Sequence, residues 1–476
     1  MKNKIYSSII VLMLVALLLS GCMVGPKYEK PKTIADSAQW SFERRFYDSN
    51  DANGIGRWWE NFADETTEKL VLEALDNNYD IIAAAAKVLQ AEAEYKMAGG
   101  KLWPQVDIGY DGKVVRQNSG PPGSATAGAG EVTKTRTHNP DMTISYVLDL
   151  FGKLKHGRAA ELKDLMQTRA NQKAVVNSLI ASVVTSRINI ATFQKRLAIA
   201  RANTQSRKNT LEIVERRYRQ GLVGPVDVRL ARENYPAAKA AEPDMELSLA
   251  TAQNALDVLL ARAIGSSKHL SETLPELPSL GPVPIGLPGS LLRQRPDVLE
   301  AEMRLQGQNQ RIGVSIANMY PDFNFTLGMG WQSNTSGMIF VDQAWFYSAL
   351  LSMAQPVFAG GQLAAKVDWE EARFKEFAAD YAKVVLTAMR EVEDEMVTQQ
   401  MLAKKLQYVQ IQFAEASAAE KLARDRYNRG VETILSVLET ERRRHNAEDS
   451  LAVLKGQIWT GRVNLFLALG GDWVSE

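Results

Sequence analysis

The chain has 476 residues, which exceeds the usual size of one compact domain and predicts either two domains or one extended architecture. Its 56 basic and 55 acidic residues give a net charge of +1, which argues against a nucleic-acid-binding protein. Four His and one Cys leave little material for metal or thiol chemistry, and a single Cys excludes an intrachain disulfide.

Residues 1–22 have the layout of a bacterial export signal. Two lysines precede an apolar run over residues 9–19, which is too short to span a bilayer. The run ends in Leu-Ser-Gly-Cys22, which resembles the lipobox of bacterial lipoproteins, whose Cys becomes the lipidated first residue. Met23 follows instead of Asp, so the resemblance implies no inner-membrane retention signal and an anchor in outer-membrane lipid. The alternative is an ordinary signal peptide with an incidental Cys.

Two long stretches, residues 158–220 and 362–429, contain neither Gly nor Pro and are rich in strong helix formers. In the first, Val176, Leu179 and Val183 follow the spacing of a packed helical stripe. At about 1.5 Å per residue, each stretch predicts a helix on the order of 95–100 Å long. Helices of this length need lateral neighbours, as in a coiled coil or a helical tube.

Segments of alternating polar and apolar residues precede each long helix. We expect strands near residues 104–118, 135–150, 321–332 and 343–357, of which the last is the least regular. Period two over about ten residues, with aromatics on the apolar face, is typical of membrane-barrel strands, and the alternative is a half-buried soluble sheet. The connecting loops, 119–130 and 333–342, are predicted to be flexible, polar tips outside the cell.

The sequence contains an internal duplication of one unit. Residues 79–105 align with 296–322, which places Trp103-Pro104 opposite Tyr320-Pro321. The motif around Phe151 corresponds to that around Phe358, and "RYRQGLVGPVDV" from Arg217 corresponds to "RYNRGVETILSV" from Arg426. Each half is therefore predicted to consist of a helix, two strands, a long helix, a turn at a Gly and a returning helix, in that order. Because four strands cannot close a barrel and open edges are not tolerated in lipid, we expect the chain to oligomerise.

The predicted domain order has six parts. It runs as signal peptide 1–21, lipidated extension 22–65, first repeat 66–265, linker 266–294, second repeat 295–470 and C-terminal tail 471–476.

The motifs resemble the TolC superfamily, in the lipoprotein branch of outer-membrane factors of RND efflux pumps (NodT/OprM/CusC-like). They are the export signal with "VGPKYEKP" (24–31), "DLFGK" (149–153), "LLRQRPDVLEAE" (291–302), "PVFAGGQL" (356–363) and the Gly-Gly-Asp-Trp tail (470–473). The resemblance covers almost the whole mature chain. It implies a mostly α-helical fold with a membrane β-barrel, closed as a homotrimer with twelve strands and a helical periplasmic tunnel. The implied partners are a periplasmic adaptor (membrane fusion protein) and an inner-membrane RND pump.

The resemblance also implies a collar built from residues near 58–96, residues 265–320 and the C-terminal tail. It assigns the two Gly corners to the periplasmic tips, where the adaptor docks, through Gly221, Leu222, Val223, Gly430 and Val431.

A gate is implied at the second corner. Asp227 and Tyr427 match a closing contact between helices, and Ser436 and Glu439 match two positions of an acidic ring at the narrowest point. Ser436 departs from the Asp that the family often has, and Glu432 replaces a basic latch residue of some members. Mutual repulsion among three Glu439 carboxylates should raise the apparent pKa of the ring, and their negative charge should attract cations. The alternative for Glu439 is a solvated charge on a helix face.

No nucleophile, phosphate-binding or zinc motif occurs, so neither an enzyme nor a cofactor is expected. His138, His156, His269 and His445 are scattered and are predicted to be surface or loop residues. The rival functions are a structural or adhesin-like lipoprotein and the outer-membrane duct of a type I secretion system. The sequence does not identify the cargo.

Overall fold

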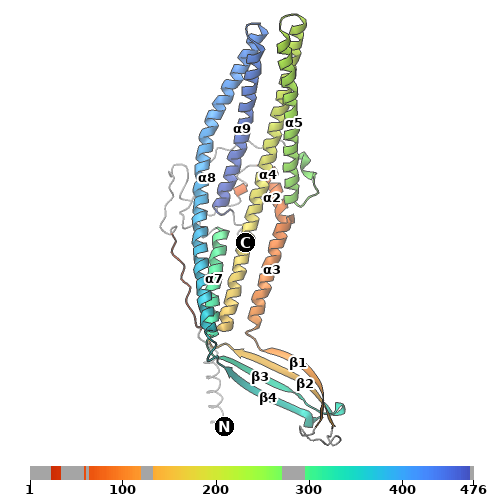
Figure 1. Cartoon of the computed structure of the whole chain (residues 1–476), viewed down its shortest axis with the longest axis vertical. Coiled ribbons are helices and arrows are strands. Elements are labelled where there is room, and N and C mark those ends of the chain that lie inside the picture. Colours follow the sequence, from red (N-terminus) through yellow and green to blue (C-terminus); the bar gives the residue numbers. More distant parts are fainter. Residues whose placement is uncertain (1–22, 34–57, 60–63, 119–131, 271–294, 472–476) are drawn as a thin grey trace, which may run out of the picture. The chain divides into compact units, whose positions relative to one another are not determined.

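The structure is a computed structural model that describes residues 23–33, 58–59, 64–118, 132–270 and 295–471 (Figure 1). Cys22, the loop 119–130 and most of the C-terminal tail lie outside the described residues. Two compact units are present, and each combines segments from both halves of the sequence. The first comprises Met1–Pro31, Val88–Thr168 and Ala301–Asp380, and the second comprises Lys32–Lys87, Arg169–Glu300 and Tyr381–Glu476.

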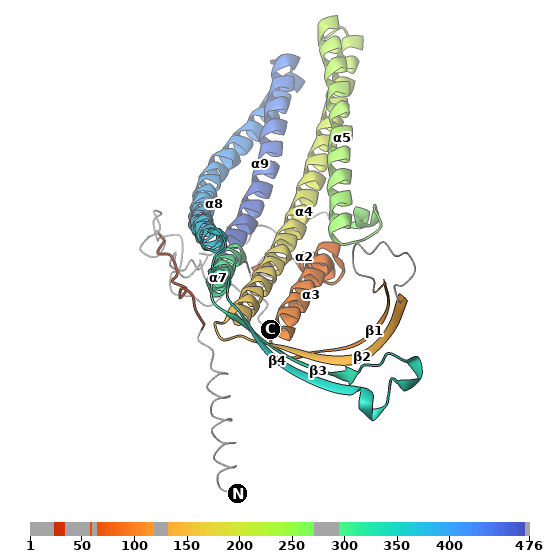
Figure 2. The same cartoon turned by 60° about the horizontal axis from the view of Figure 1, so that its bottom comes forward.

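The first unit contains a four-stranded antiparallel sheet in the order β1-β2-β3-β4 (Figure 2). Its strands are β1 (Gln105–Asn118), β2 (Val132–Leu148), β3 (Asp322–Trp331) and β4 (Trp345–Ala354). Val106 lies opposite Ile144 in the first hairpin, and Tyr146 lies opposite Phe325 where the two hairpins join. All four predicted strands are therefore present, and β1 and β4 form the two edges of the sheet in this chain.

The sheet exposes apolar side chains along both of its edge strands. Val106, Ile108 and Tyr110 on β1 are 59%, 84% and 60% exposed, and Leu351 and Met353 on β4 are also exposed. Strands that leave an apolar face uncovered are typical of a barrel that faces lipid, and the soluble alternative would have covered it.

The loop 333–342 departs from its prediction. It contains the 3₁₀ turn η5 (Ser336–Met338), and a second turn, η6 (Asp342–Ala344), begins at its end. Phe340 packs edge-on against Trp331 with ring centroids 5.3 Å apart. The loop is therefore partly structured by an aromatic contact, which its Gly, Ser and Thr content did not predict.

The two long helices agree with the prediction. α4 (Lys153–Arg219) and α8 (Gln362–Asn428) each have 67 residues, and the returning helices α5 (Pro225–Leu259) and α9 (Ile434–Ala468) each have 35. By length and composition α4 is the one described helix that could cross a membrane, but 56% of its most apolar window is buried in the structure. It is therefore a core helix of the bundle.

Shorter helices precede the strands, namely α2 (Glu65–Asn77) and α3 (Tyr79–Gly100) before β1 and α7 (Pro296–Ala317) before β3. α5 continues without a break through Pro236 and Pro243. Proline in a helix interior costs roughly 3 kcal/mol, yet these two do not interrupt the returning helix. The surrounding helical residues therefore outweigh that cost.

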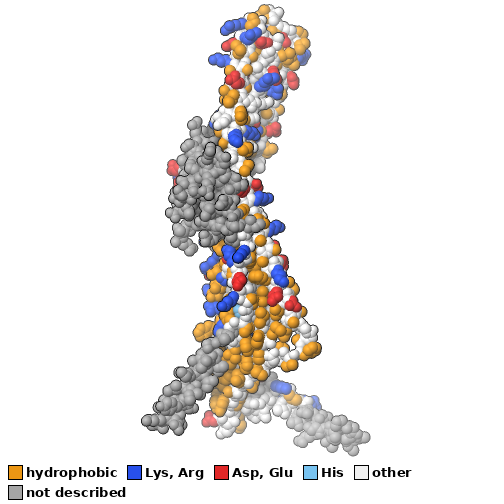
Figure 3. Space-filling view, turned by 90° about the vertical axis from the view of Figure 1, so that its left-hand side faces the viewer, with side chains coloured by type: hydrophobic (Ala, Val, Ile, Leu, Met, Phe, Trp, Pro, Cys, Tyr) orange, Lys and Arg blue, Asp and Glu red, His pale blue; other side chains and the backbone are white. Residues whose placement is uncertain are grey.

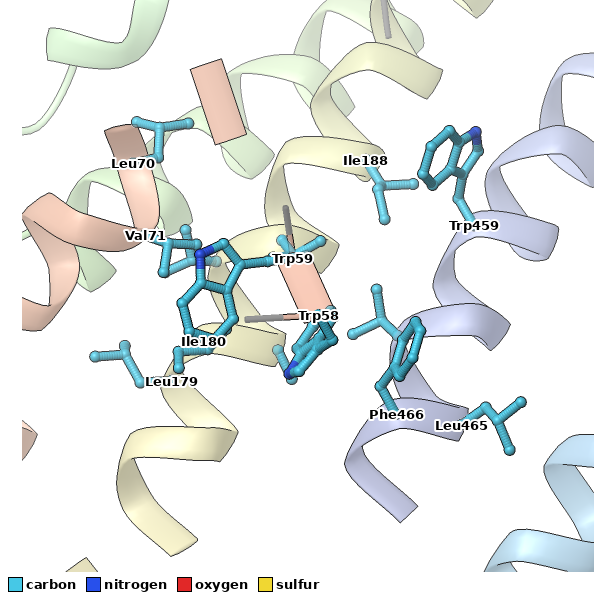
Figure 4. Close-up of a cluster of buried hydrophobic side chains, with 14 of the residues drawn as sticks. Trp58, Trp59, Leu70, Val71, Leu179, Ile180, Ile188, Trp459, Leu465 and Phe466 are labelled. Atoms are coloured by element: carbon cyan, nitrogen blue, oxygen red, sulfur yellow. The ribbon is translucent and has the colours of Figure 1, made fainter. Parts of the chain in front are cut away.

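The main core of the second unit gathers around two tryptophans (Figure 4). Trp58 stacks on Phe466 of α9 with ring centroids 5.3 Å apart and meets Trp59 edge-on at 6.0 Å. Leu70 and Val71 of α2 belong to the same buried cluster, together with Ile180 and Ile188 of α4. The N-terminal segment is thus tied into the helical bundle by large aromatic side chains, which are strong contributors to burial.

In the first unit, the segment that follows Cys22 packs at the end of the sheet. Met23 contacts Gly152, whose φ of +78° and close surroundings leave no room for a side chain. The Val24 amide donates to the Phe151 carbonyl at 3.2 Å, and the Val24 carbonyl lies 3.0 Å from Nε2 of His156. This segment is therefore held beside the junction of β2 and α4.

Candidate gate and docking tips

The two Gly corners share one turn geometry. Gly221 and Gly430 have φ of +73° and +80°, the left-handed region that glycine adopts without strain. The Leu222 amide donates to the Arg217 carbonyl at 2.9 Å, and the Val431 amide donates to the Arg426 carbonyl at 3.1 Å. The glycine amides donate to the Tyr218 and Tyr427 carbonyls, each at 2.9 Å. Both long helices therefore end in the Schellman arrangement that a left-handed glycine permits.

Both tips expose apolar side chains at equivalent positions. One residue after the glycine, Leu222 is 65% and Val431 63% exposed, and five residues after it, Val226 is 67% and Leu435 58% exposed. Val223 is half-buried and packs on the cluster beneath the tips. At the upper end of Figure 3, hydrophobic side chains alternate with Lys, Arg, Asp and Glu. The tips therefore present a mixed surface of exposed apolar and charged side chains.

A buried cluster joins the two hairpins below their tips. It combines Val214 of α4, Val228 of α5, Tyr427 of α8 and Val437 of α9. Arg217 crosses between the corners, because its Nη1 donates to the Tyr427 carbonyl at 2.8 Å and its Nη2 donates to the Asn428 carbonyl at 3.1 Å. Its guanidinium also lies over the Tyr427 ring, 4.5 Å from the centroid.

A buried carboxylate forms a second link between the hairpins. Glu441 of α9 is 1% exposed, and its Oε1 accepts from Arg424 of α8 at 2.6 Å and from Thr210 of α4 at 2.8 Å. Its Oε2 lies 3.0 Å from Nη1 of Arg207 on α4, an ion pair without hydrogen-bond alignment. Burial lowers the pKa of the Arg207 guanidinium, and the neighbouring Glu441 opposes that shift. A more exposed pair, Arg196–Asp449, links α4 to α9 at 2.7 Å.

The predicted contact between Asp227 and Tyr427 is not formed within this chain. The Tyr427 hydroxyl is buried and has no hydrogen-bond partner in the described structure, Asp227 included. Tyr427 is instead held through its ring and its carbonyl by Arg217, because the turn points the carbonyl towards the first hairpin.

Ser436 and Glu432 contact each other at the start of α9. The Ser436 hydroxyl donates to the Glu432 carboxylate at 2.8 Å, and Thr433 caps the helix by accepting from the Ser436 amide. The hydrogen bond from Ser436 lowers the pKa of Glu432, with smaller help from the Thr433 amide and Arg426. Glu432 therefore stabilises its own turn and its own helix start.

Glu439 behaves differently from the expectation of a raised pKa. It accepts from Arg442 at 2.9 and 2.8 Å and from Arg443 at 2.7 Å. The hydrogen bonds from Arg442 and then Arg443 lower its pKa from 4.5 to about 2. Within one chain, the charge of the Glu439 carboxylate is thus balanced by two arginines, three and four residues further along the helix. The expectation of a ring of like charges did not include these two arginines.

Two of the four histidines differ from the prediction that all four lie at the surface or in loops. His156 is 6% exposed and hydrogen-bonds Gln310 at 2.8 Å as well as Val24, and burial lowers the pKa of His445. These two are therefore buried or half-buried packing residues on helices. Among the described residues, no group of three or more His, Cys, Asp or Glu side chains could hold a metal ion.

Sequence reasoning missed the links through Arg217 and Glu441. A signal for Glu441 was present, because Ile434, Val437, Leu438 and Glu441 follow the i, i+3, i+4, i+7 spacing of a buried helix face. A carboxylate in a position that the pattern assigns to an apolar residue needs a buried partner. Its partners on α4 and α8 could not be read from the spacing, since they lie on other helices.

The fold and the two matched hairpins define one protomer of a TolC-like outer-membrane channel. The chain matches the family described as outer membrane efflux protein over residues 70–262 and again over residues 287–471. It therefore belongs to that family, and the two matches fall on the two halves of the duplicated sequence.

Several characterised relatives match over nearly their full length. The pyoverdine export outer membrane protein OpmQ of Pseudomonas putida is 28% identical over 420 residues, which cover 88% of this chain and 89% of OpmQ. The cation efflux system protein CusC of Escherichia coli is 27% identical over 460 residues, 96% of this chain and 97% of CusC. The toluene efflux pump outer membrane protein TtgF of P. putida is 27% identical over 463 residues, 96% of this chain and 95% of TtgF.

Solved structures confirm the fold. The outer-membrane channel OprN superposes with a TM-score of 0.83 at 25% identity, covering 95% of this chain and 100% of OprN. CusC superposes with a TM-score of 0.81 at 25% identity, covering 95% of this chain and 100% of CusC. The CmeC channel of Campylobacter jejuni, at 22% identity, has a TM-score of 0.84 and supports the fold alone. These relatives are transport channels, which agrees with the absence of catalytic motifs in the sequence.

Proposed function

We propose that this chain is the exit duct of a tripartite efflux system, assembled as a homotrimer that receives cargo from an inner-membrane RND pump through a periplasmic adaptor. The duplicated unit, with one strand hairpin and one long helical hairpin in each half, is the observation that carries this proposal. The relatives bear names of pyoverdine, cation and toluene export, so the family accommodates unlike cargo and the cargo of this chain follows from its pump.

Closure of the barrel supports the trimer. The edge strands β1 and β4 leave backbone groups without partners in this chain, and such edges cannot remain open in lipid. Three copies would supply twelve strands and pair every edge. The outer-membrane duct of a type I secretion system would share this architecture. The names of the relatives reported above give no support to this second function.

Lipidation of Cys22 is the proposed second anchor. Met23, the next residue, packs on Gly152 at the end of β2, where a barrel would leave the bilayer. A lipid on the preceding residue would lie close to the membrane surface, while the barrel itself holds the protein in the bilayer. Labelled palmitate should enter the wild type but not Cys22→Ser, and both should form trimers. Unlabelled wild type would overturn the lipoprotein assignment.

The two tips are the proposed docking surface for the adaptor. Gly221, Leu222 and Val223 supply one tip and Gly430 and Val431 the other. Both tips expose apolar side chains at equivalent positions. Keeping apolar surface in water costs about 25 cal/mol of free energy for each Å². An adaptor that covers these side chains would remove that cost.

The hairpin α8–α9 is the proposed gate, with Ser436 and Glu439 on its returning helix facing the channel axis. Arg217 and the Glu441 ion cluster tie this hairpin to α4, so opening would require these contacts to separate. The Asp227–Tyr427 pair is proposed only as a contact of another gate state, since it is not formed here.

The function is tested by deleting the gene and measuring resistance to dyes, detergents, antibiotics and metal salts. The proposal expects sensitivity to at least one class, restored by the wild-type gene. Unchanged resistance together with loss of a secreted protein would favour the secretion duct.

A further inference from the structure

One aromatic contact connects the two halves of the chain where strands give way to helices. Phe151, three residues after β2, stacks on Tyr320, two residues before β3, with ring centroids 4.6 Å apart and planes at 24°. β2 and β3 are antiparallel neighbours, so the end of one meets the start of the other. The stack therefore closes the seam between the first and the second repeat.

The duplication supplies a second pair of the same kind. The sequence alignment of the halves places Phe358 in the role of Phe151 and Trp103 in the role of Tyr320. Phe358 lies four residues after β4, and Trp103 lies two residues before β1. β4 and β1 are the two edges of the sheet, so the chain cannot bring this pair together by itself (Figure 2).

The exposure of these side chains agrees with a missing partner. Phe358 is 91% and Trp103 71% exposed, whereas Phe151 is half-buried and Tyr320 is 40% exposed. Val357, next to Phe358, is 92% exposed. Large aromatic side chains this exposed at a strand end are unusual unless another surface covers them.

We infer that Phe358 of one protomer stacks on Trp103 of the next, forming an aromatic joint that closes the seam between subunits as Phe151 and Tyr320 close the seam within one. The inference rests on the proposed trimer and adds the residues that connect its copies. β4 ends where the helices begin, and β1 of a second copy starts there, so an antiparallel pairing of these edges brings the two aromatics to the same end.

The joint between subunits has a longer connection than the joint within a chain. Four residues, 149–152, separate β2 from α4, whereas seven residues, 355–361, separate β4 from α8. Gly360 and Gly361 both adopt positive φ, +58° and +83°, and no atom lies close to either of their missing side chains. The extra length lets Phe358 reach a partner beyond the sheet edge.

The rival occupant for Phe358 is the lipid of the inner leaflet, since aromatic residues also gather at membrane interfaces. A cysteine pair distinguishes the two. In a Cys22→Ser background, which removes the single native Cys, Trp103→Cys with Phe358→Cys is treated with an oxidant in intact outer membranes. The matched control is Phe151→Cys with Tyr320→Cys, whose residues meet within one chain.

The joint predicts species of two and three subunits on a denaturing, non-reducing gel for the Trp103–Phe358 pair. The control pair should form its disulfide without any increase in mass. A trimer on a native gel that yields only single-subunit bands from the first pair, while the control pair oxidises, would assign Phe358 to lipid and overturn the joint. Absence of the trimer from the wild-type protein on the native gel would overturn the proposed assembly instead.

A second measurement avoids removal of the aromatic rings. The photoreactive residue p-benzoylphenylalanine replaces Phe358 in the otherwise unaltered chain, and the membranes are illuminated. The joint predicts a covalent product of two subunits whose peptide map joins residue 358 to the segment around Trp103. Products confined to lipid, or to a distant segment, would contradict it.

Discussion

The two Gly corners use nearly the same residues in unlike ways. Arg217 spans to the second corner and holds the carbonyls of Tyr427 and Asn428, whereas the equivalent Arg426 pairs with Glu432 in its own turn at 3.4 Å. Tyr427 is 4% exposed, and the equivalent Tyr218 is 47% exposed. A repeated sequence thus gives two copies of one turn, but each copy's contacts depend on which neighbour it has.

The returning helices differ in the same direction. Of 35 residues each, α9 buries 15 and α5 buries 6. α9 is therefore packed more extensively against its own chain than α5, which leaves apolar side chains such as Leu247 and Val258 uncovered. We therefore extend the gate proposal: the uncovered side chains of the first hairpin would contact neighbouring copies, and the second hairpin would be held to α4 through Arg217 and Glu441.

The largest expected effect concerns the tips. Leu222→Asp should abolish efflux, because a carboxylate in a docking surface would be buried without a partner. Val431→Asp should do the same if both corners dock, and should have little effect if only the first corner does. Resistance in a complemented deletion strain gives the readout, with Leu222→Met as the apolar control. Full resistance in Leu222→Asp with an intact trimer would refute docking through this tip.

Removal of the buried carboxylate should be next in size. Glu441→Ala leaves Arg207 buried and Arg424 half-buried without their shared partner, and breaking a buried pair typically costs about 3–5 kcal/mol. We expect weaker attachment of the second hairpin and higher single-channel conductance in planar bilayers. Asp449→Ala breaks a partly exposed pair and should change conductance much less, since such pairs contribute about 0–1 kcal/mol. Equal effects from the two variants would contradict a special role for Glu441.

A smaller effect is expected at the lower ends of the returning helices. Ala261, the one described non-glycine residue with positive φ, stands at +52° after α5, where the equivalent position after α9 is Gly470 at +106°. A left-handed alanine costs about 1–2 kcal/mol, partly offset by the greater entropy that glycine loses on folding. Ala261→Gly should therefore raise thermal stability by about 0.5–1 kcal/mol, and Gly470→Ala should lower it. Thermal dissociation of the trimer measures both, and a loss of stability in Ala261→Gly would show that the turn is unstrained.

The smallest effect should come from acidification. The pKa of Glu439 is lowered to about 2 by Arg442 and Arg443, so its ion pairs persist above its ordinary value of 4.5 and are lost only as pH falls towards about 2. Cation selectivity, measured as reversal potential, should therefore stay constant from about pH 7 to pH 4. Arg442→Ala with Arg443→Ala should introduce a pH dependence into that range and strengthen block by multivalent cations. A change of cation selectivity in the wild type between about pH 5 and pH 6 would instead support a ring of mutually repelling Glu439 carboxylates.

The sequence predicted what depends on local pattern. Gly-free and Pro-free stretches predicted α4 and α8, period-two alternation predicted the strands, and the two Gly corners predicted where the long helices end. What the sequence did not predict depends on neighbours in space. The partners of Arg217 and Glu441 lie on other helices, the bonding of Tyr427 depends on how two turns face each other, and the charge state of Glu439 depends on rotamers of two arginines. The resemblance proposed gate residues, but it did not predict the contacts that the structure shows around them.

If the second hairpin gates the channel by separating from α4, a covalent bridge between α4 and α9 should keep the gate shut. In a Cys22→Ser background, Arg196→Cys with Asp449→Cys is bridged by a short bifunctional thiol reagent, which ties α4 to α9. Glu215→Cys with Arg232→Cys ties α4 to α5 within the first hairpin and serves as the control. The α4–α9 bridge should abolish efflux and hold conductance at its lowest level until the bridge is cleaved, while the control should remain active. Undiminished efflux with the α4–α9 bridge complete would contradict this gating mechanism.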